Sequence, residues 1–325
     1  MKKTRLVYIL AASHSGSTLL AILLGGHPGI CTVGELKATS MGDVDHYLCS
    51  CRARIKECPF WSDMKQEMAD RGLSFDITDA GTDLLCGAGP YIRRLLRPLH
   101  RGPALELVRD AALSLSPAWR SRLSRFQIRN SSLVDSLRAR TGRDVVVDSS
   151  KVGIRLKYLL GNPTLDIRIV RLIRDGRGVA LAYVDPARFA DAADPGLRGG
   201  GAGGRREGEK LTVAEAALEW RRSNEEADAV LSGLDPSRWR NVRYEELCAD
   251  PDRTLRSLFG FIGVDPGVGV EQLDFGGLHV IGNGMRLDIS RRILLDERWR
   301  QTLGPLDLRV FDSVAGSLNR RLGYL

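Results

Sequence analysis

The residues at the start of the chain constrain its fold more than any other stretch. Residues 5–10 read RLVYIL, residues 11–18 read AASHSGST, and a second apolar run, LLAILL, follows at residues 19–24. The first run is rich in large apolar side chains and predicts a buried strand of a parallel sheet. Ser17 and Thr18 predict the first turn of a helix. The backbone N–H groups at this helix start, next to Gly16, predict a cradle for a phosphate group.

The predicted cradle differs from the P-loop of ATPases and kinases. The P-loop pattern GxxxxGK[ST] has a glycine where Ala11 and Ala12 stand, and a lysine where Ser17 stands. Because that lysine binds the β- and γ-phosphates, its absence disfavours ATP as the ligand.

The rest of the chain alternates short apolar strands with helices. Further strands are predicted at residues 29–33, 143–148, 166–173 and 241–244, and Ser149 is expected to start the helix after the second of these. This rhythm predicts one α/β domain over residues 1–325, a three-layer sandwich around a mostly parallel sheet of about five strands. Residues 41–143 have helical spacing and many arginines, and they predict a helical insertion on the acceptor side of the site. The glycine-rich residues 199–204 predict either a lid over the site or a plain surface loop.

Charge and hydropathy narrow the class of protein. The net charge of +8 and the pI near 9.4 favour anionic ligands. Lys2 and Lys3 precede apolar residues as in a secretory signal, but Ser13 to Ser15 interrupt that apolar run. We therefore expect an uncleaved, cytoplasmic protein without a membrane span, since no stretch of about eighteen apolar residues occurs.

Three of the six cysteines lie close together in the sequence. Cys49, Cys51 and Cys58 form a C-x-C-x6-C run that could bind zinc if a fourth ligand such as His46 joined them. The spacing is not that of the common zinc modules. We therefore expect reduced structural thiols, no metal, and folding that does not depend on a metal.

The residues SHSGSTLL at 13–20 resemble the 5′-phosphosulfate loop of sulfotransferases that use 3′-phosphoadenosine 5′-phosphosulfate (PAPS). His14 stands where that family commonly has Lys or Arg. The resemblance implies that PAPS is the co-substrate and adenosine 3′,5′-bisphosphate the product. It also implies donor contacts from the loop residues Ser13, His14, Ser15, Gly16, Ser17, Thr18 and Leu19.

Three later segments resemble the same family in the same order. Residues 172–183 are similar to its 3′-phosphate motif, with Arg174 matching and Ala182 in the place of a serine. Tyr244, in YEEL, matches a tyrosine near the adenine, and HVIGNGMR at 279–286 resembles a bacterial form of the loop over the nucleotide. This implies nucleotide contacts from Asn283 and Arg286.

Two residues that follow strands are candidates for catalysis. Glu35 follows the second strand in a Gly-Glu pair that resembles the catalytic glutamate of tyrosylprotein sulfotransferases, and we predict it as the general base. Lys151 is predicted to stabilise the charge that develops on the leaving phosphate, and His14 to stabilise the donor side. His46 is the remaining competitor for the base.

The resemblance therefore implies transfer of a sulfuryl group from PAPS to an acceptor hydroxyl on a small molecule, a sugar or a tyrosine, without a metal. One alternative is a Mg²⁺-dependent nucleotide kinase that uses Asp148 and Lys151. A second is a non-catalytic binder of nucleic acid through the arginine-rich insertion. The second is disfavoured because aromatic residues, which stack on bases, make up only 6% of the chain, and we expect no nucleic-acid partner.

Overall fold

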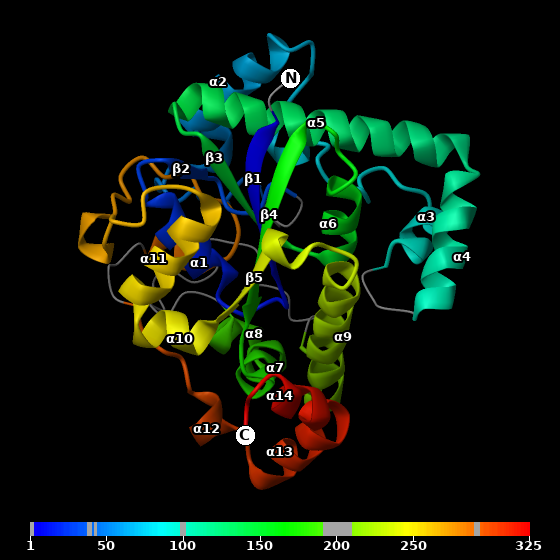
Figure 1. The fold of residues 1–325 in the computed structure, drawn as a ribbon, viewed down its shortest axis with the longest axis vertical. Coiled ribbons are helices and arrows are strands. Elements are labelled where there is room, and N and C mark those ends of the chain that lie inside the picture. The colour runs from blue at the N-terminus through cyan, green and yellow to red at the C-terminus, as the bar shows by residue number, and fades with distance from the viewer. Residues whose placement is uncertain (1–2, 38–40, 42–43, 98–101, 191–209, 289–292) are drawn as a thin grey trace.

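The computed structural model of the protein describes residues 3–37, 41, 44–97, 102–190, 210–288 and 293–325. The glycine-rich residues 199–204 lie outside this part. One sheet has the strand order β2-β3-β1-β4-β5, and each of its pairs is parallel (Figure 1). The strands are β1 (Thr4–Ala11), β2 (Ile30–Thr32), β3 (Val145–Lys151), β4 (Leu165–Ile173) and β5 (Trp239–Arg243). The predicted α/β sandwich with about five strands is confirmed.

β1 lies in the middle of the sheet and is buried on both faces. Its side chains alternate between the faces because successive residues of a strand point in opposite directions. The apolar side chains at its centre are at most 1% exposed: Leu6, Val7, Tyr8, Ile9 and Leu10. A strand of this kind requires a helical layer on each face of the sheet.

The first layer covers Val7 and Ile9. Apolar side chains from three helices share one buried cluster with these two residues. The helices are α1 (Ser17–Gly25), α10 (Tyr244–Ala249) and α11 (Pro251–Ile262). Seven of the nine residues of α1 are non-polar and all nine are buried, so the helix is covered on every side.

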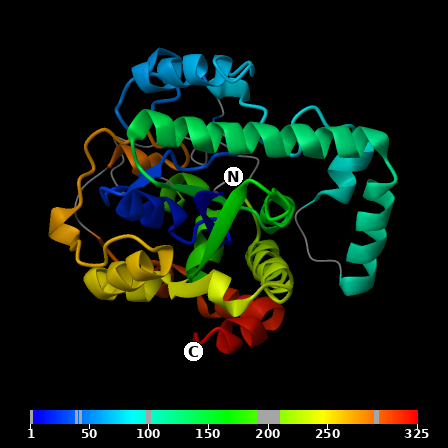
Figure 2. The ribbon, with the colours of Figure 1, turned by 45° about the horizontal axis from the view of Figure 1, so that its top comes forward.

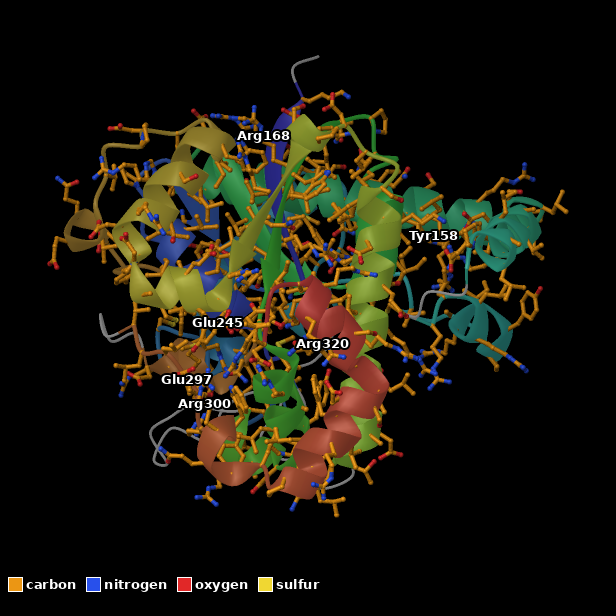
Figure 3. The ribbon with its side chains drawn as sticks, turned by 60° about the horizontal axis from the view of Figure 1, so that its bottom comes forward. Tyr158, Arg168, Glu245, Glu297, Arg300 and Arg320 are labelled. Atoms are coloured by element: carbon orange, nitrogen blue, oxygen red, sulfur yellow. The ribbon has the colours of Figure 1, made fainter. Side chains whose placement is uncertain are left out.

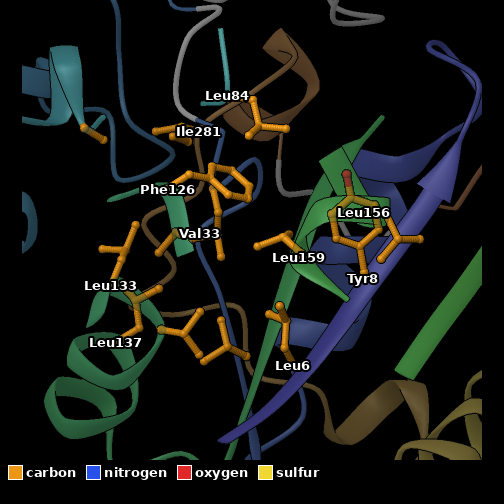
Figure 4. Close-up of a cluster of buried hydrophobic side chains, with 14 of the residues drawn as sticks. Leu6, Tyr8, Val33, Leu84, Phe126, Leu133, Leu137, Leu156, Leu159 and Ile281 are labelled. Atoms are coloured by element: carbon orange, nitrogen blue, oxygen red, sulfur yellow. The ribbon is translucent and has the colours of Figure 1, made fainter. Parts of the chain in front are cut away.

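The second layer covers Leu6 and Tyr8 (Figure 4). Leu133 and Leu137 of one helix, and Leu156 of another, pack in the same cluster. The helices of this layer are α5 (Pro117–Thr141), α6 (Gly153–Leu159) and α9 (Val213–Leu231). A capping box between Thr212 and Glu215 fixes the start of α9.

The predicted insertion at residues 41–143 is helical. It contains α2 (Pro59–Ala69), α3 (Pro90–Leu95), α4 (Pro103–Ser114) and α5, and α5 runs across the sheet with α4 at its far end (Figure 2). Tyr158 reaches from α6 toward this corner (Figure 3), where its hydroxyl donates to Asp110 of α4 at 3.3 Å. Lys157 pairs with the same carboxylate, so α6 anchors the insertion to the sheet.

A third group of helices covers the end of the molecule that holds the C-terminus. Trp220 of α9 packs against Phe311, and the Tyr324 hydroxyl donates to Glu245 of α10 at 2.7 Å. The helices are α7 (Gly176–Val184), α8 (Pro186–Phe189), α12 (Trp299–Thr302), α13 (Pro305–Phe311) and α14 (Ser317–Arg321).

Two boundaries differ from the prediction. β3 continues through Lys151, because the N–H groups of Ser149 and Ser150 donate to Gly34 and to the Asp148 carboxylate instead of starting a helix. β5 ends at Arg243, and Tyr244 begins α10.

The strand order creates a switch point at β1. From β1 the chain moves toward β2 on one side, whereas from β3 it crosses to β4 on the other side. In open α/β sheets, ligands bind beyond the carboxyl ends of the strands at such a point.

Candidate functional site: an anion cradle with an ion pair at the strand ends

The turn between β1 and α1 has the geometry of an anion cradle. Gly16 caps α1 with a left-handed backbone (φ 88°), and a Cβ atom there would lie 2.6 Å from Cδ2 of Tyr244. The start of α1 leaves backbone N–H groups without intrahelical partners. Beside them, the buried hydroxyl of Ser15 has no hydrogen-bond partner among the described residues. Donors of this kind fit a phosphate or sulfate group.

Arg174, at the end of β4, brings a positive charge to this turn. Its buried guanidinium donates to the carbonyl of His14 at 2.9 Å and lies over the ring of Tyr244, 4.6 Å from the centroid. The same guanidinium donates to the Asp296 carboxylate at 3.0 Å. The structure therefore places Arg174 beside the cradle, as predicted, and gives it a carboxylate partner that sequence reasoning missed.

Asp296 remains ionised in this position. Burial alone would raise its pKa, but hydrogen bonds from Arg298 and the charge of Arg174 hold the pKa well below its usual range. No sequence motif pointed to Asp296, because it meets Arg174 across more than a hundred residues of chain.

Glu35 and Lys151 form an ion pair at the ends of two neighbouring strands. Their side chains are 15% and 16% exposed, so both charges lie mostly out of water yet within reach of a ligand. Glu35 follows β2, and its N–H donates to the carbonyl of Ile281 at 3.4 Å. Lys151 ends β3 with a left-handed backbone (φ 70°), which is rare for a residue with a side chain and typical of functional sites. The structure thus joins two residues that the sequence predicted separately.

His14 lies near two positive charges, those of Lys151 and Arg174. Its ring packs edge-on against Tyr183, with the centroids 4.6 Å apart. Burial, followed by the charges of Lys151 and Arg174, lowers the pKa of His14 to about 3. The ring is therefore neutral near pH 7 and carries one N–H donor, unlike the Lys or Arg that commonly stands at this position in the family it resembles.

Three further residues predicted at the nucleotide make structural contacts. The Arg286 guanidinium is fully buried over the ring of Tyr47 and donates to the carbonyls of Leu48 and Gly282. This arrangement does not support the predicted contact between Arg286 and the nucleotide.

The other two predicted residues are Asn283 and Ala182, and their contacts in the structure do not argue against binding of a nucleotide. The Asn283 side chain accepts the N–H of Met285 at 3.0 Å and caps a short 3-10 turn, Gly284–Leu287. Ala182 is buried beside Phe189 and Trp299, where a serine would have had to find a hydrogen-bond partner. Their contact with a nucleotide stays a prediction.

Asp148 has a structural role that counts against the kinase alternative. The carboxylate is fully buried, accepts the N–H groups of Leu36 and Ser150 at 3.1 and 2.9 Å, and pairs with Arg155 at 3.1 Å. A Mg²⁺-binding aspartate needs oxygens that reach the ligand, whereas both oxygens of Asp148 are engaged inside the protein.

In the described part of the chain, no helix is long and apolar enough to cross a membrane. The predicted cytoplasmic location is not tested by this finding.

Among known proteins, the chain is similar in sequence to carbohydrate sulfotransferases. No family model matches the chain. A stretch of 181 residues is 31% identical to carbohydrate sulfotransferase 5 of Mus musculus, covering 51% of this chain and 44% of that protein. Carbohydrate sulfotransferase 2 of Homo sapiens is 25% identical over 304 residues, covering 81% of this chain and 53% of that protein. The chain spans about half the length of these curated relatives.

Among solved structures, a sulfotransferase domain from the curacin biosynthetic pathway superposes with a TM-score of 0.50. It is 18% identical, and the match covers 100% of this chain and 99% of that one. This likeness shows a shared fold.

Proposed function

We infer that this chain, a member of the sulfotransferase family, transfers a sulfuryl group from PAPS to a hydroxyl group of a carbohydrate. The sequence relationship and the fold are the basis for the family. The observation that most supports the activity is the meeting of the cradle, Arg174 and the Glu35–Lys151 ion pair at the carboxyl ends of four neighbouring strands. The names of the curated relatives favour a carbohydrate over a tyrosine or a small phenol as the acceptor.

The cradle and Arg174 would hold the two anionic ends of the donor. In this proposal the N–H groups at the start of α1 and the Ser15 hydroxyl donate to the 5′-phosphosulfate. Arg174 donates to the 3′-phosphate with charge-assisted hydrogen bonds. Since Asp296 already holds this guanidinium, the phosphate has to take over part of that contact. Tyr244, whose ring lies against Gly16 and Arg174, is the proposed neighbour of the adenine.

Glu35 would act as the general base on the acceptor. It accepts the hydroxyl proton while the acceptor oxygen bonds to sulfur, and the bond between sulfur and the bridging phosphate oxygen breaks. The electron pair leaves with adenosine 3′,5′-bisphosphate. The ion pair between Glu35 and Lys151 suits this order of steps. An anionic donor attracts Lys151 and thereby frees the Glu35 carboxylate to accept the proton of the acceptor.

His14 and Lys151 would stabilise the leaving oxygen. Lys151 supplies a full positive charge, whereas the neutral ring of His14 supplies only an N–H donor. The lowered pKa of His14 keeps its ring neutral near pH 7 in the free protein.

The activity is tested with PAPS labelled at sulfur. The purified chain is incubated with the labelled donor and a panel of neutral and amino sugars, oligosaccharides, a tyrosyl peptide and a simple phenol. We expect the label on a carbohydrate, and its transfer should be lost with Glu35→Gln. Label on the tyrosyl peptide or the phenol alone would overturn the acceptor class, and no transfer to any acceptor would count against the activity.

Calorimetric titration separates the donor from the alternatives. Adenosine 3′,5′-bisphosphate should bind without added metal, whereas ATP with Mg²⁺ and a DNA oligomer should bind weakly or not at all. Tight binding of ATP with Mg²⁺ would favour the kinase alternative, and salt-sensitive binding of DNA would favour the nucleic-acid alternative.

A further inference from the structure

Three cysteine side chains that lie close together in the sequence meet a histidine from a distant part of the chain. They are Cys49, Cys51, Cys58 and His279, which we name the thiol–histidine cluster. One sulfur or nitrogen atom from each lies within 4.8 Å of all the others. His46 was the example of a fourth ligand considered from the sequence, but it is exposed, and the histidine of the cluster is His279 near the other end of the chain.

The distances within the cluster match a tetrahedral site. Sγ of Cys58 lies 3.3 Å from Nδ1 of His279, Sγ of Cys49 lies 3.8 Å from the same nitrogen, and the sulfurs of Cys51 and Cys58 are 3.6 Å apart. Zinc bonds of about 2.3 Å to sulfur and 2.0–2.1 Å to nitrogen imply edges of about 3.8 Å between sulfurs and about 3.6 Å between sulfur and nitrogen. We propose that the thiol–histidine cluster binds a structural zinc ion.

The local backbone directs the cysteines to one point. Leu48 and Arg54 form an antiparallel bridge, and the N–H of Cys49 donates to the carbonyl of Ala53 at 2.9 Å. Arg52 turns the chain between them with a left-handed backbone (φ 67°). This tight turn places the side chain of Cys51 back toward Cys49, and Cys58 follows at the residue before α2.

The histidine is held in place from the other side. Its ring stacks on Phe60 of α2, with centroids 4.4 Å apart and planes 5° apart. Two hydrogen bonds of Ser50 fix the neighbouring backbone, one to the carbonyl of Leu278 at 2.6 Å and one from the N–H of Val280 at 2.7 Å. Three thiolates and a neutral imidazole form a set of four protein ligands, which leaves no open position and is typical of structural zinc.

The zinc ion would cross-link the start of the insertion to the segment that borders Glu35. In this segment the Tyr47 hydroxyl donates to the carbonyl of Gly282 at 3.0 Å and accepts its N–H at 2.6 Å. A Cβ atom on Gly282 would lie 3.4 Å from Oε1 of Glu35, so Gly282 lines the carboxylate directly. We therefore assign the ion a positioning role for this wall of the site and no part in the chemistry.

Metal content tests the proposal without any assay of activity. The full chain, purified without chelators, should contain one zinc per protein by elemental analysis. When the chain is refolded with Co²⁺ in place of zinc, it should show thiolate-to-cobalt absorption in the near ultraviolet and tetrahedral bands in the visible region. A metal-free preparation should melt roughly 5–10 °C lower and recover when zinc is returned.

The zinc content of single-residue variants tests whether the metal binds at the thiol–histidine cluster. Cys51→Ser changes the exposed cysteine of the cluster, so the fold should persist while bound zinc falls at least tenfold. His279→Gln should have the same effect on zinc. Cys86→Ser and Cys248→Ser remove thiols outside the cluster, and both variants should keep one zinc per protein.

Three results would overturn the proposal. The wild-type chain could contain no zinc and gain none when zinc is supplied under reducing conditions. Mass spectrometry could find a disulfide between Cys51 and Cys58 in the protein purified under reducing conditions. The Cys51→Ser variant could retain full zinc content while folded. A zinc-containing chain that transfers no sulfate would leave this site intact and count only against the proposed function.

Discussion

The guanidinium of Arg174, at the end of β4, lies 3.0 Å from the Asp296 carboxylate. In the proposed reaction, the 3′-phosphate of the donor binds to this same guanidinium. The guanidinium also lies over the aromatic ring of Tyr244. A guanidinium that contacts both a carboxylate and a ring is oriented before the donor arrives, so little side-chain freedom is lost on binding.

Arg174→Ala should therefore weaken binding of adenosine 3′,5′-bisphosphate by about tenfold or more, because charge-assisted hydrogen bonds to the 3′-phosphate are lost. Affinity for adenosine 5′-phosphate, which lacks that group, should barely change. Calorimetry with both ligands measures the difference, and Arg240→Ala, an exposed arginine of β5, is the control. Equal losses for both ligands would remove Arg174 from this role.

Glu35→Gln keeps the shape of the side chain and removes its ability to take a proton. Since general-base help contributes about 10²–10⁴-fold, turnover should fall by about that factor while affinity for adenosine 3′,5′-bisphosphate stays nearly the same. Glu57→Gln, an exposed glutamate of the insertion, is the matched control. Wild-type turnover in the Glu35→Gln variant would show that another group is the base, and His46 would be tested next.

The position of the cradle could be predicted from the sequence, because the strand, the turn and the start of the helix that form it follow one another directly in the chain. Arg286 could not be placed in the same way. Its carbonyl partner on Leu48 lies 238 residues away, and only the folded chain shows that its guanidinium is used there.

At the scale of elements, β3 is tied to the insertion through one buried arginine. Arg155 of α6 donates to the carbonyl of Thr82 at 2.5 Å and to Asn130 of α5 at 2.6 Å, and it pairs with Asp148 of β3 at 3.1 Å. Both charged side chains are at most 2% exposed. Such a network fixes how α5 and α6 lie on the sheet, since neither charge is stable there without the other.

Asp148→Asn should lower the free energy of unfolding by about 3–5 kcal/mol, because Arg155 then keeps a buried charge without a carboxylate. Urea denaturation measures the change. The double variant with Arg155→Met should be less destabilised than the sum of the two single variants.

Asp144→Asn, at an exposed carboxylate just before β3, should be nearly neutral and serves as the control. A stable Asp148→Asn variant that lost Mg²⁺-dependent nucleotide binding would instead restore the kinase alternative.

The types of the elements were predictable where the spacing of apolar residues decides them, as in the core strands and the helical insertion. The end of β3 was not, because Ser149 and Ser150 are ordinary helix-start residues. Their N–H groups instead find acceptors at Gly34 and Asp148, and one of these contacts comes from a neighbouring strand end.

At the scale of the whole molecule, two partly exposed side chains with shifted pKa values make stability depend on pH in opposite directions. The pKa of His14 is lowered from 6.5 to about 3, so the unfolded chain binds more protons between these values and stability falls as the pH drops through this window. Burial, and next the charge of Glu106, raises the pKa of Glu226 from 4.5 to about 7. The folded chain then binds the extra proton, and stability falls as the pH rises from 4.5 to 7.

Glu226→Gln separates the two effects. At pH 8 the wild-type chain holds a partly buried carboxylate next to the start of α6, and the variant holds a neutral amide whose oxygen can accept the same backbone N–H groups of Gly153 and Ile154. The free energy of unfolding should therefore rise by about 1–3 kcal/mol at pH 8 and change little at pH 5, where the glutamate is already protonated. Urea denaturation at both pH values measures this, with Glu225→Gln, a more exposed neighbour on α9, as the control. The same change at both pH values would mean that packing, and not the partly buried charge, governs this position; a loss of stability at pH 8 would mean that the ionised carboxylate stabilises the start of α6 through the helix dipole.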